Sequence, residues 1–287
     1  MHSYMLCLQV LNICPVSKTV FVMGIWVIRT LAPIIVTTTF YTSVHDIRFL
    51  LALEMIRLAC SAGYKVIVVD GSPESWVQAA LQQCGAVVLR EIPGKGMGAS
   101  RRQAIQAALD DPDNTGVIIW LEPEKAPLVP LLAPVVRKIT VDGIDLVVPR
   151  RESLVSYPQY QQYCELTGNH LVGNCTGRPE LDLWFGPRAM NRRVAQLFTD
   201  YGGEYGDRWD SIFIPVARAI AMSQPQPLQS PEQPIKVASV VVSYQHPPQQ
   251  TAAETNDMTM NRKRDQQLNE LVGAMRAECL KLGLPKK

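Results

Sequence analysis

Several recognisable patterns are missing from these 287 residues, and each absence disfavours a class of protein. No Cys-x-x-Cys pair occurs among the seven cysteines, which makes a zinc knuckle or a disulfide framework unlikely and favours a reducing compartment, the cytoplasm. There is no Gly-x-Ser-x-Gly, which disfavours a hydrolase of that type, and no Walker motif. The 28 basic side chains nearly balance the 26 acidic ones, so nothing predicts a nucleic-acid partner.

Long apolar runs are also few. Residues 1–31 contain two apolar stretches, 1–16 and 19–28, which Lys18 separates. The second is half as long as the roughly 20 residues that a membrane-spanning helix needs. The order of basic and apolar residues is not that of a signal peptide. We therefore expect residues 1–31 to be an apolar extension outside the core, with a peripheral membrane contact as the alternative.

From residue 32 onward, β-branched apolar runs alternate with helical segments. The expected strands are 32–39, 66–70, 86–90, 116–121 and 145–148. The expected helices between them are 44–62, 74–84 and one that the loop 94–98 opens and that runs through 109. A proline-punctuated helix is expected after residue 125. This alternation predicts a mostly parallel, doubly wound, Rossmann-like α/β sheet.

Polar residues follow the ends of several of these strands. They are Thr37–Thr39, Asp70, Glu91–Gly98, Glu122–Lys125 and Arg150–Arg151. Such sheets bind ligands in the crevice beyond the carboxyl ends of the strands. The sequence therefore predicts a ligand site at this edge.

Two carboxylates at this edge are candidates for metal binding. Glu122 and Glu124 lie two residues apart just past a strand, and in extended backbone such side chains face the same way. Mg²⁺ and Mn²⁺ prefer oxygen ligands and often bridge to a diphosphate. The alternative is a solvated acidic turn in which Glu124 pairs with Lys125.

A glycine-rich loop, 94–98, precedes the helix that carries Arg101, and Lys95 lies within it. Backbone N–H groups of such a loop can approach a phosphate at a helix N-terminus, although a simple tight turn explains it equally well. Asp70, at a strand end, is placed to accept hydrogen bonds from a base or ribose. Its alternative role is to cap the next helix.

The second half of the chain is less regular. We expect helices at 158–171, 191–198, 211–221 and 258–282, and strands at 183–185 and 237–244. Residues 223–234 are rich in proline and glutamine and are expected to form a surface loop. His246 follows the last strand, and a lone histidine is more often structural than a ligand. Asp207 and Asp210 flank a helix start, where capping is the alternative to catalysis.

Three segments in this order resemble nucleotide-sugar glycosyltransferases of the GT-A fold. They are VIVVDGSPESWVQAAL, GKGMGASRRQAIQAAL and GVIIWLEPEK. Further on, LDLWFGPRAM resembles the acceptor-side strand, and GEYGDRWDSIF resembles an acidic segment that often supplies a catalytic base. Glu122-Pro123-Glu124 stands where the family has Asp-x-Asp, and Asp70 stands alone where the family usually has two aspartates.

The resemblance implies an enzyme, a hexosyltransferase-like glycosyltransferase that moves a sugar from a UDP- or GDP-linked donor to the hydroxyl of an unknown acceptor. The implied nucleotide-sugar-binding residues are Thr38, Asp70, Lys95, Arg101 and Glu122. Glu122 and Glu124, with His246 as a further ligand, are the implied metal ligands for Mg²⁺ or Mn²⁺, and Asp210 or Asp207 is the implied base.

The domain boundaries follow from the same pattern. We expect a glycosyltransferase-like domain at 32–257, with a nucleotide half at 32–151 and an acceptor half at 152–257, and then a C-terminal helix at 258–287. Two other functions stay open on the same fold. One is a sugar-phosphate nucleotidyltransferase, and the other is a non-catalytic nucleotide-sugar-binding protein.

Overall fold

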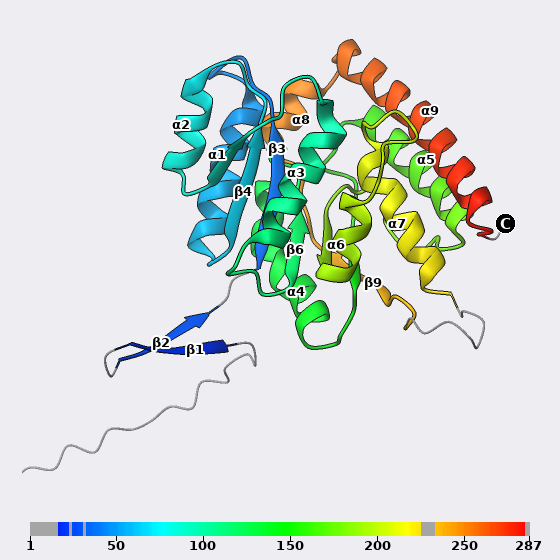
Figure 1. Ribbon diagram of the computed structural model, residues 1–287. Helices are drawn as coiled ribbons and strands as arrows, with labels where there is room; N and C mark the ends of the chain where they lie inside the picture. The colour runs from blue at the N-terminus through cyan, green and yellow to red at the C-terminus, as the bar shows by residue number, and fades with distance from the viewer. Residues whose placement is uncertain (1–16, 23–24, 31–32, 225–232, 285–287) are drawn as a thin grey trace, which may run out of the picture.

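The computed structural model describes residues 17–22, 25–30, 33–224 and 233–284 (Figure 1). Its main sheet has seven strands in the order β5-β4-β3-β6-β8-β7-β9. Their bounds are β3 Ile34–Thr39, β4 Lys65–Asp70, β5 Val87–Arg90, β6 Val117–Trp120, β7 Leu146–Arg151, β8 Arg188–Asn191 and β9 Val237–Val242. Strand β8 pairs antiparallel with β6 and β7, and the other pairings are parallel. The predicted mostly parallel sheet is confirmed.

Helices cover both faces of this sheet. On one face lie α1 Ile47–Ser61, α2 Ser75–Gln83, the 3₁₀ helix η1 Ala126–Leu131 and α4 Leu132–Thr140. On the other lie α3 Gly96–Asp110, α5 Gln159–Thr176, α6 Arg192–Thr199, α7 Asp210–Met222 and α9 Met258–Lys281. Successive residues of β3 serve the two faces, since Ile34 and Val36 pack in one core cluster and Ile35 in the other. This is the doubly wound arrangement, and its central strands are apolar because both faces are covered.

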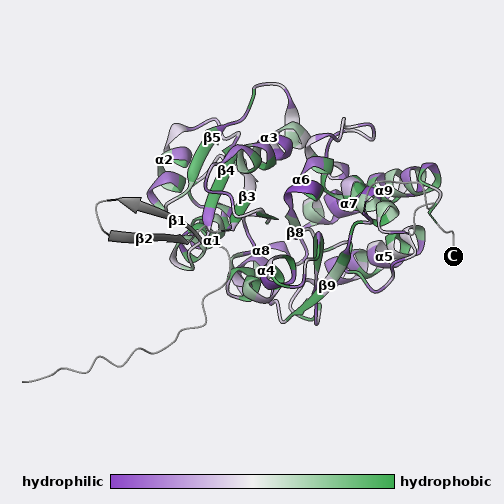
Figure 2. Ribbon diagram, turned by 60° about the horizontal axis from the view of Figure 1, so that its bottom comes forward, coloured by the Kyte–Doolittle hydropathy of each residue, from purple (hydrophilic) through white to green (hydrophobic). Residues whose placement is uncertain are grey.

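The last helix belongs to the same core. Helix α9 packs on α5 and α7 along one side of the molecule (Figure 1). Its residues Leu271, Met275 and Cys279 are buried with the apolar side chains of α3, α6 and α7. Figure 2 shows α9 alternating hydrophilic and hydrophobic residues, whereas β4, β5 and β9 are largely hydrophobic. Short helix α8 (Pro248–Glu254) leads into α9.

The predicted extension at 1–31 lies partly outside the described residues. Within it, β1 (Ser17–Val22) and β2 (Ile25–Thr30) pair antiparallel as a separate two-stranded sheet. Across the described parts of the chain, every helix is too short or too polar to cross a membrane.

The second half differs from the sequence-based expectation in several details, two of which have a direct physical reason. Residues 183–185, expected as a strand, form a turn, because the carboxylate of Asp182 accepts a hydrogen bond from the backbone N–H of Phe185. The strand begins later, as β8 at Arg188. Helix α5 continues past residue 171 and ends at Thr176, where Gly177 adopts a left-handed conformation (φ 71°) that stops it.

Candidate functional site

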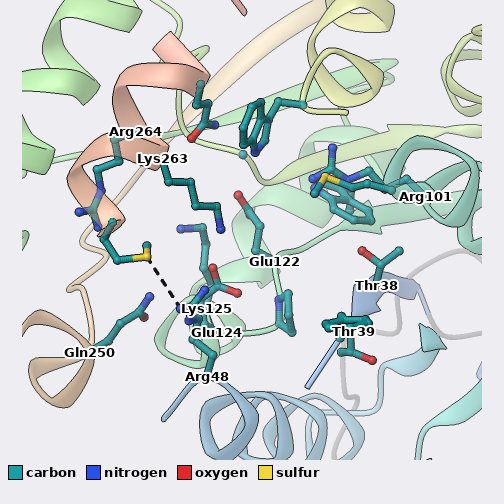
Figure 3. A pocket seen from close by; sticks show the side chains of 18 of the residues that line it. Thr38, Thr39, Arg48, Arg101, Glu122, Glu124, Lys125, Gln250, Lys263 and Arg264 are labelled. Carbon is teal, nitrogen blue, oxygen red and sulfur yellow. Dashed lines mark hydrogen bonds between the residues drawn. The ribbon is translucent and has the colours of Figure 1, made fainter. Parts of the chain in front are cut away.

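A pocket of about 510 Å³ opens at the carboxyl edge of the sheet, where ligand sites of such folds lie. Its walls come from the loops after β3 and β6, from α3, from the turn before β8, and from helices α8 and α9. Figure 3 shows the side chains around it. The lining includes Thr38, Thr39, Arg48, Arg101, Glu122, Glu124, Lys125, Trp184, Trp209, Gln250, Lys263 and Arg264. The volume is within the range of small-molecule sites.

Glu122 lies among positive charges inside the pocket wall. Its carboxylate presses against the backbone of Gly186, and its Oε2 is buried without a hydrogen-bond partner. Burial lowers the pKa of Arg101 to about 10 and that of Arg188 to about 10, and the charge of Glu122 opposes the shift in both. Glu122 is therefore held by packing and long-range attraction, with one oxygen left for a ligand.

Glu124 also lines the pocket, where it is half-buried. Burial raises the pKa of Glu124 above its usual range, and the charge of Lys125 opposes that shift. In the described chain no ion pair within 4 Å joins these two side chains, although they are neighbours. An added cation would favour the ionised carboxylate.

Lys125 is a buried cation, 8% exposed, that packs against aromatic rings. Its ammonium lies 5.0 Å from the ring centre of Phe185 and 5.5 Å from that of Tyr244. Burial acts to lower the pKa of Lys125, but Tyr157, Glu122 and other neighbours raise it well above its ordinary value. The side chain therefore carries its charge at neutral pH.

Besides Glu122, two of the predicted nucleotide-sugar-binding residues line the pocket, namely Thr38 and Arg101. The guanidinium of Arg101 lies 5.2 Å from the ring centre of Trp120 and donates to the Arg208 carbonyl (2.7 Å). Lys95 is exposed in the loop before α3 and is not among the lining residues.

Asp70 lies behind the pocket wall instead of facing the cavity. It is fully buried, and its carboxylate accepts hydrogen bonds from the hydroxyls of Thr39 (2.8 Å) and Ser72 (2.6 Å). The Ser72 hydroxyl in turn accepts from the backbone N–H of Tyr41. The carboxylate thereby fixes the loop after β3, which lines the pocket.

The predicted catalytic aspartates lie on either side of Trp209, which itself lines the pocket, but neither carboxylate does. Asp207 forms an ion pair with Arg102, and its backbone carbonyl accepts from Gly98 (2.9 Å). Asp210 is 4% exposed and accepts hydrogen bonds from the hydroxyl of Tyr201 and from the backbone N–H groups of Asp207 (3.2 Å) and Arg208 (2.6 Å). A base role for either residue stays a prediction.

His246, the third predicted metal ligand, is 3% exposed and does not line the pocket. Its ring stacks on Tyr157 with 4.3 Å between the ring centres, and neither ring nitrogen has a hydrogen-bond partner. Burial lowers its pKa to about 3, assisted by the charge of Lys125. Among the described residues, no group of three or more His, Cys, Asp or Glu side chains is arranged to hold a metal ion.

No protein-family model matches this chain, and no curated protein matches it in sequence. Solved structures do share its fold. Glucosyl-3-phosphoglycerate synthase from Mycobacterium tuberculosis, in complex with Mn²⁺, UDP and glucosyl-3-phosphoglycerate, is similar with a TM-score of 0.54 at 15% identity, over 88% of this chain and 81% of that one. Mannosyl-3-phosphoglycerate synthase from Rubrobacter xylanophilus is similar with a TM-score of 0.56 at 15% identity, over 89% and 76%. The fold is of the GT-A nucleotide-diphospho-sugar transferase type.

Several lining residues of this GT-A chain were not predicted from its sequence. Arg48 comes from α1, Gln250 from α8, and Lys263 and Arg264 from α9 (Figure 3). The basic run at 262–264 was visible in the sequence, but only the packing of α9 brings it to the sheet edge.

Proposed function

We propose that this protein is a glycosyltransferase that moves a sugar, a hexose, from a UDP- or GDP-linked donor to an acceptor hydroxyl. The observation that carries the proposal is the buried, unpartnered oxygen of Glu122, beside Glu124, in a pocket at the ligand-binding edge of a GT-A sheet. The structural neighbour from Mycobacterium tuberculosis binds UDP and Mn²⁺, which supports a similar donor here.

Mg²⁺ or Mn²⁺ is the cofactor we propose. Mg²⁺ in particular is often held by one or two carboxylates together with substrate phosphates, so two glutamates in one pocket fit it. Glu122 would offer its unpartnered oxygen to the ion. Burial raises the pKa of Glu124, and the charge of the ion would oppose that shift and favour the ionised carboxylate. When bound, the ion would neutralise charge on the departing diphosphate.

The remaining residues position the two substrates in this proposal. Thr38, near the end of β3 and next to the loop that Asp70 fixes, and Arg101 would contact the nucleotide. Trp184 and Trp209 would exclude water around the transferred sugar. An inverting reaction also needs a general base, for which Asp210 or Asp207 is our prediction, whereas a retaining reaction does not.

Turnover of nucleotide sugars tests this proposal. Wild type should hydrolyse or transfer from at least one member of a panel of UDP- and GDP-sugars, and Mn²⁺ or Mg²⁺ should raise the rate. Glu122→Gln should lower it, whereas Glu54→Gln, an exposed glutamate on α1, should not. Absence of both turnover and nucleoside diphosphate binding would refute the proposal. Release of pyrophosphate from a nucleoside triphosphate and a sugar phosphate would instead identify a nucleotidyltransferase.

A further inference from the structure

One end of the pocket collects four positive side chains from distant parts of the chain. They are Arg48 on α1, Lys125 after β6, and Lys263 and Arg264 on α9, and we call them the cationic cluster. Helices α1 and α9 meet there, where Nη2 of Arg48 lies 3.8 Å from Sδ of Met260 (dashed line in Figure 3). The cluster therefore depends on the tertiary fold and not on a local run of basic residues.

Two of these four charges lack a close carboxylate partner. In the described part of the chain, no acidic group lies within 4 Å of the ammonium of Lys125 or of Lys263. Arg48 has only Asp46, at 3.9 Å. Lys125 and Lys263 thus have no ion-pair partner of their own, although carboxylates that include Glu122 and Glu124 line the same pocket.

Arg264 has a buried N–H group without a hydrogen-bond acceptor. The residue is 8% exposed, and its Nη2 donates to Glu254 and to Gln161 (2.8 Å). Its Nη1 is buried with no hydrogen-bond partner. Glu254 is already occupied by this arginine and by the amide of Gln250 (2.9 Å). An unpaired buried guanidinium N–H is costly, so a ligand oxygen at this position would remove a penalty.

Repulsion between the positive charges of Lys263 and Arg48 also favours a bound anion. Partial burial lowers the pKa of Lys263, and the neighbouring charge of Arg48 adds to that effect. An anion between these groups would offset the repulsion from Arg48.

We propose that the cationic cluster is an oxyanion-binding subsite that holds a phosphate group of a substrate. Phosphate oxygens suit a set of lysines and arginines, because these offer several N–H donors and no acceptor. The phosphate could come from the diphosphate of the donor, or from a phosphorylated acceptor. This assignment of the source rests on the proposed function, whereas the oxyanion site itself does not.

Calorimetry with inorganic pyrophosphate in a buffer that contains Mg²⁺ tests the subsite directly. Wild type should bind, Lys263→Ala should weaken binding at least about tenfold, and Lys263→Arg should restore most of it. Arg262→Ala is the matched control, since this exposed neighbour on α9 does not line the pocket. The proposal is overturned if wild type does not bind pyrophosphate, or if Lys263→Ala binds it as wild type does.

Two further titrations identify the source of the phosphate. Weaker binding of UDP, with binding of uridine unchanged, in Lys263→Ala would assign the subsite to the donor diphosphate. Unchanged UDP affinity, with loss of inorganic phosphate binding to the UDP-saturated protein, would assign it to the acceptor. If pyrophosphate binding depends on Lys263, but the protein neither turns over a nucleotide sugar nor binds a nucleoside diphosphate, the oxyanion site stands and the proposed function fails.

Discussion

A β-carbon placed on Gly186 would lie 1.7 Å from Oε1 of Glu122, far inside van der Waals contact. The carboxylate therefore occupies space that only glycine leaves open at this position. Because Gly186 precedes β8 and Glu122 follows β6, the antiparallel pairing of these two strands determines where the carboxylate sits.

We expect Gly186→Ala to displace this carboxylate. The clash is with the end of a flexible side chain, so Glu122 should move while the backbone stays, and the free energy of unfolding should change by less than about 1 kcal/mol. Metal-supported turnover should fall by about 100-fold, as a misplacement of about 1 Å can cost. The control is Gly202→Ala, where the new β-carbon would meet nothing closer than 3.7 Å. Equal activity in both variants would contradict the importance of this contact.

The sheet and part of the site could be predicted from sequence because both depend on local patterns. The apolar strands β3 and β4 are continuous β-branched runs. Thr38 lies at the carboxyl end of β3, and Glu122 and Glu124 follow β6 closely. Residues that reach the pocket through tertiary packing could not be found in this way. Lys263 lies more than 200 positions from Arg48 in the chain, and only the packing of α9 brings them together.

Local patterns also do not specify which way a side chain points or which groups it hydrogen-bonds. Asp70 follows a strand end by the same rule as Glu122, yet the hydroxyls of Thr39 and Ser72 hold it in the interior. Strand β8 was missed because its Arg188 is fully buried, contrary to the usual apolar pattern. Its Nη1 and Nη2 donate to carbonyls of the preceding turn, among them that of Leu183 at 2.6 Å.

Glu124→Gln should separate function from stability. Burial raises the pKa of Glu124, so the ionised form is disfavoured in the native state and destabilises it as pH rises through that raised pKa. The amide should therefore leave the melting temperature at pH 7 unchanged or higher, while Mn²⁺-supported turnover falls at least about tenfold, because a metal ligand is lost. Thermal melts and chelator-controlled kinetics measure the two effects. Undiminished turnover in excess chelator would reject the metal role of this residue.

Asp210→Asn should destabilise the protein. The carboxylate accepts three hydrogen bonds at one turn, and an amide cannot accept all of them, so we expect a loss of about 1–3 kcal/mol in urea unfolding. Asp207→Asn weakens a partly exposed ion pair and should cost less than about 1 kcal/mol. A wild-type unfolding midpoint for Asp210→Asn would contradict this reading. A base role would appear separately, as a fall in kcat of about 10²–10⁴ at temperatures where the variant is folded.

His246→Phe should make the protein more resistant to acid. Burial lowers the pKa of His246 to about 3, whereas the unfolded chain takes up this proton near pH 6.5. Between these values the unfolded state binds one more proton, so this histidine makes the free energy of unfolding fall by about 1.4 kcal/mol for each pH unit of acidification. Above pH 6.5 it contributes no pH dependence.

Phenylalanine keeps the stack on Tyr157 and removes two nitrogens that have no hydrogen-bond partner. We therefore expect the variant to match or exceed wild-type stability at pH 7 and to diverge upward from it between pH 6 and pH 4, in urea titrations at each pH. His170→Phe, at an exposed histidine on α5, is the control and should follow the wild-type curve. Parallel curves for His246→Phe and wild type would show that this imidazole is protonated in the native state. Loss of Mn²⁺-supported turnover at pH 8 without loss of stability would instead support His246 as a metal ligand.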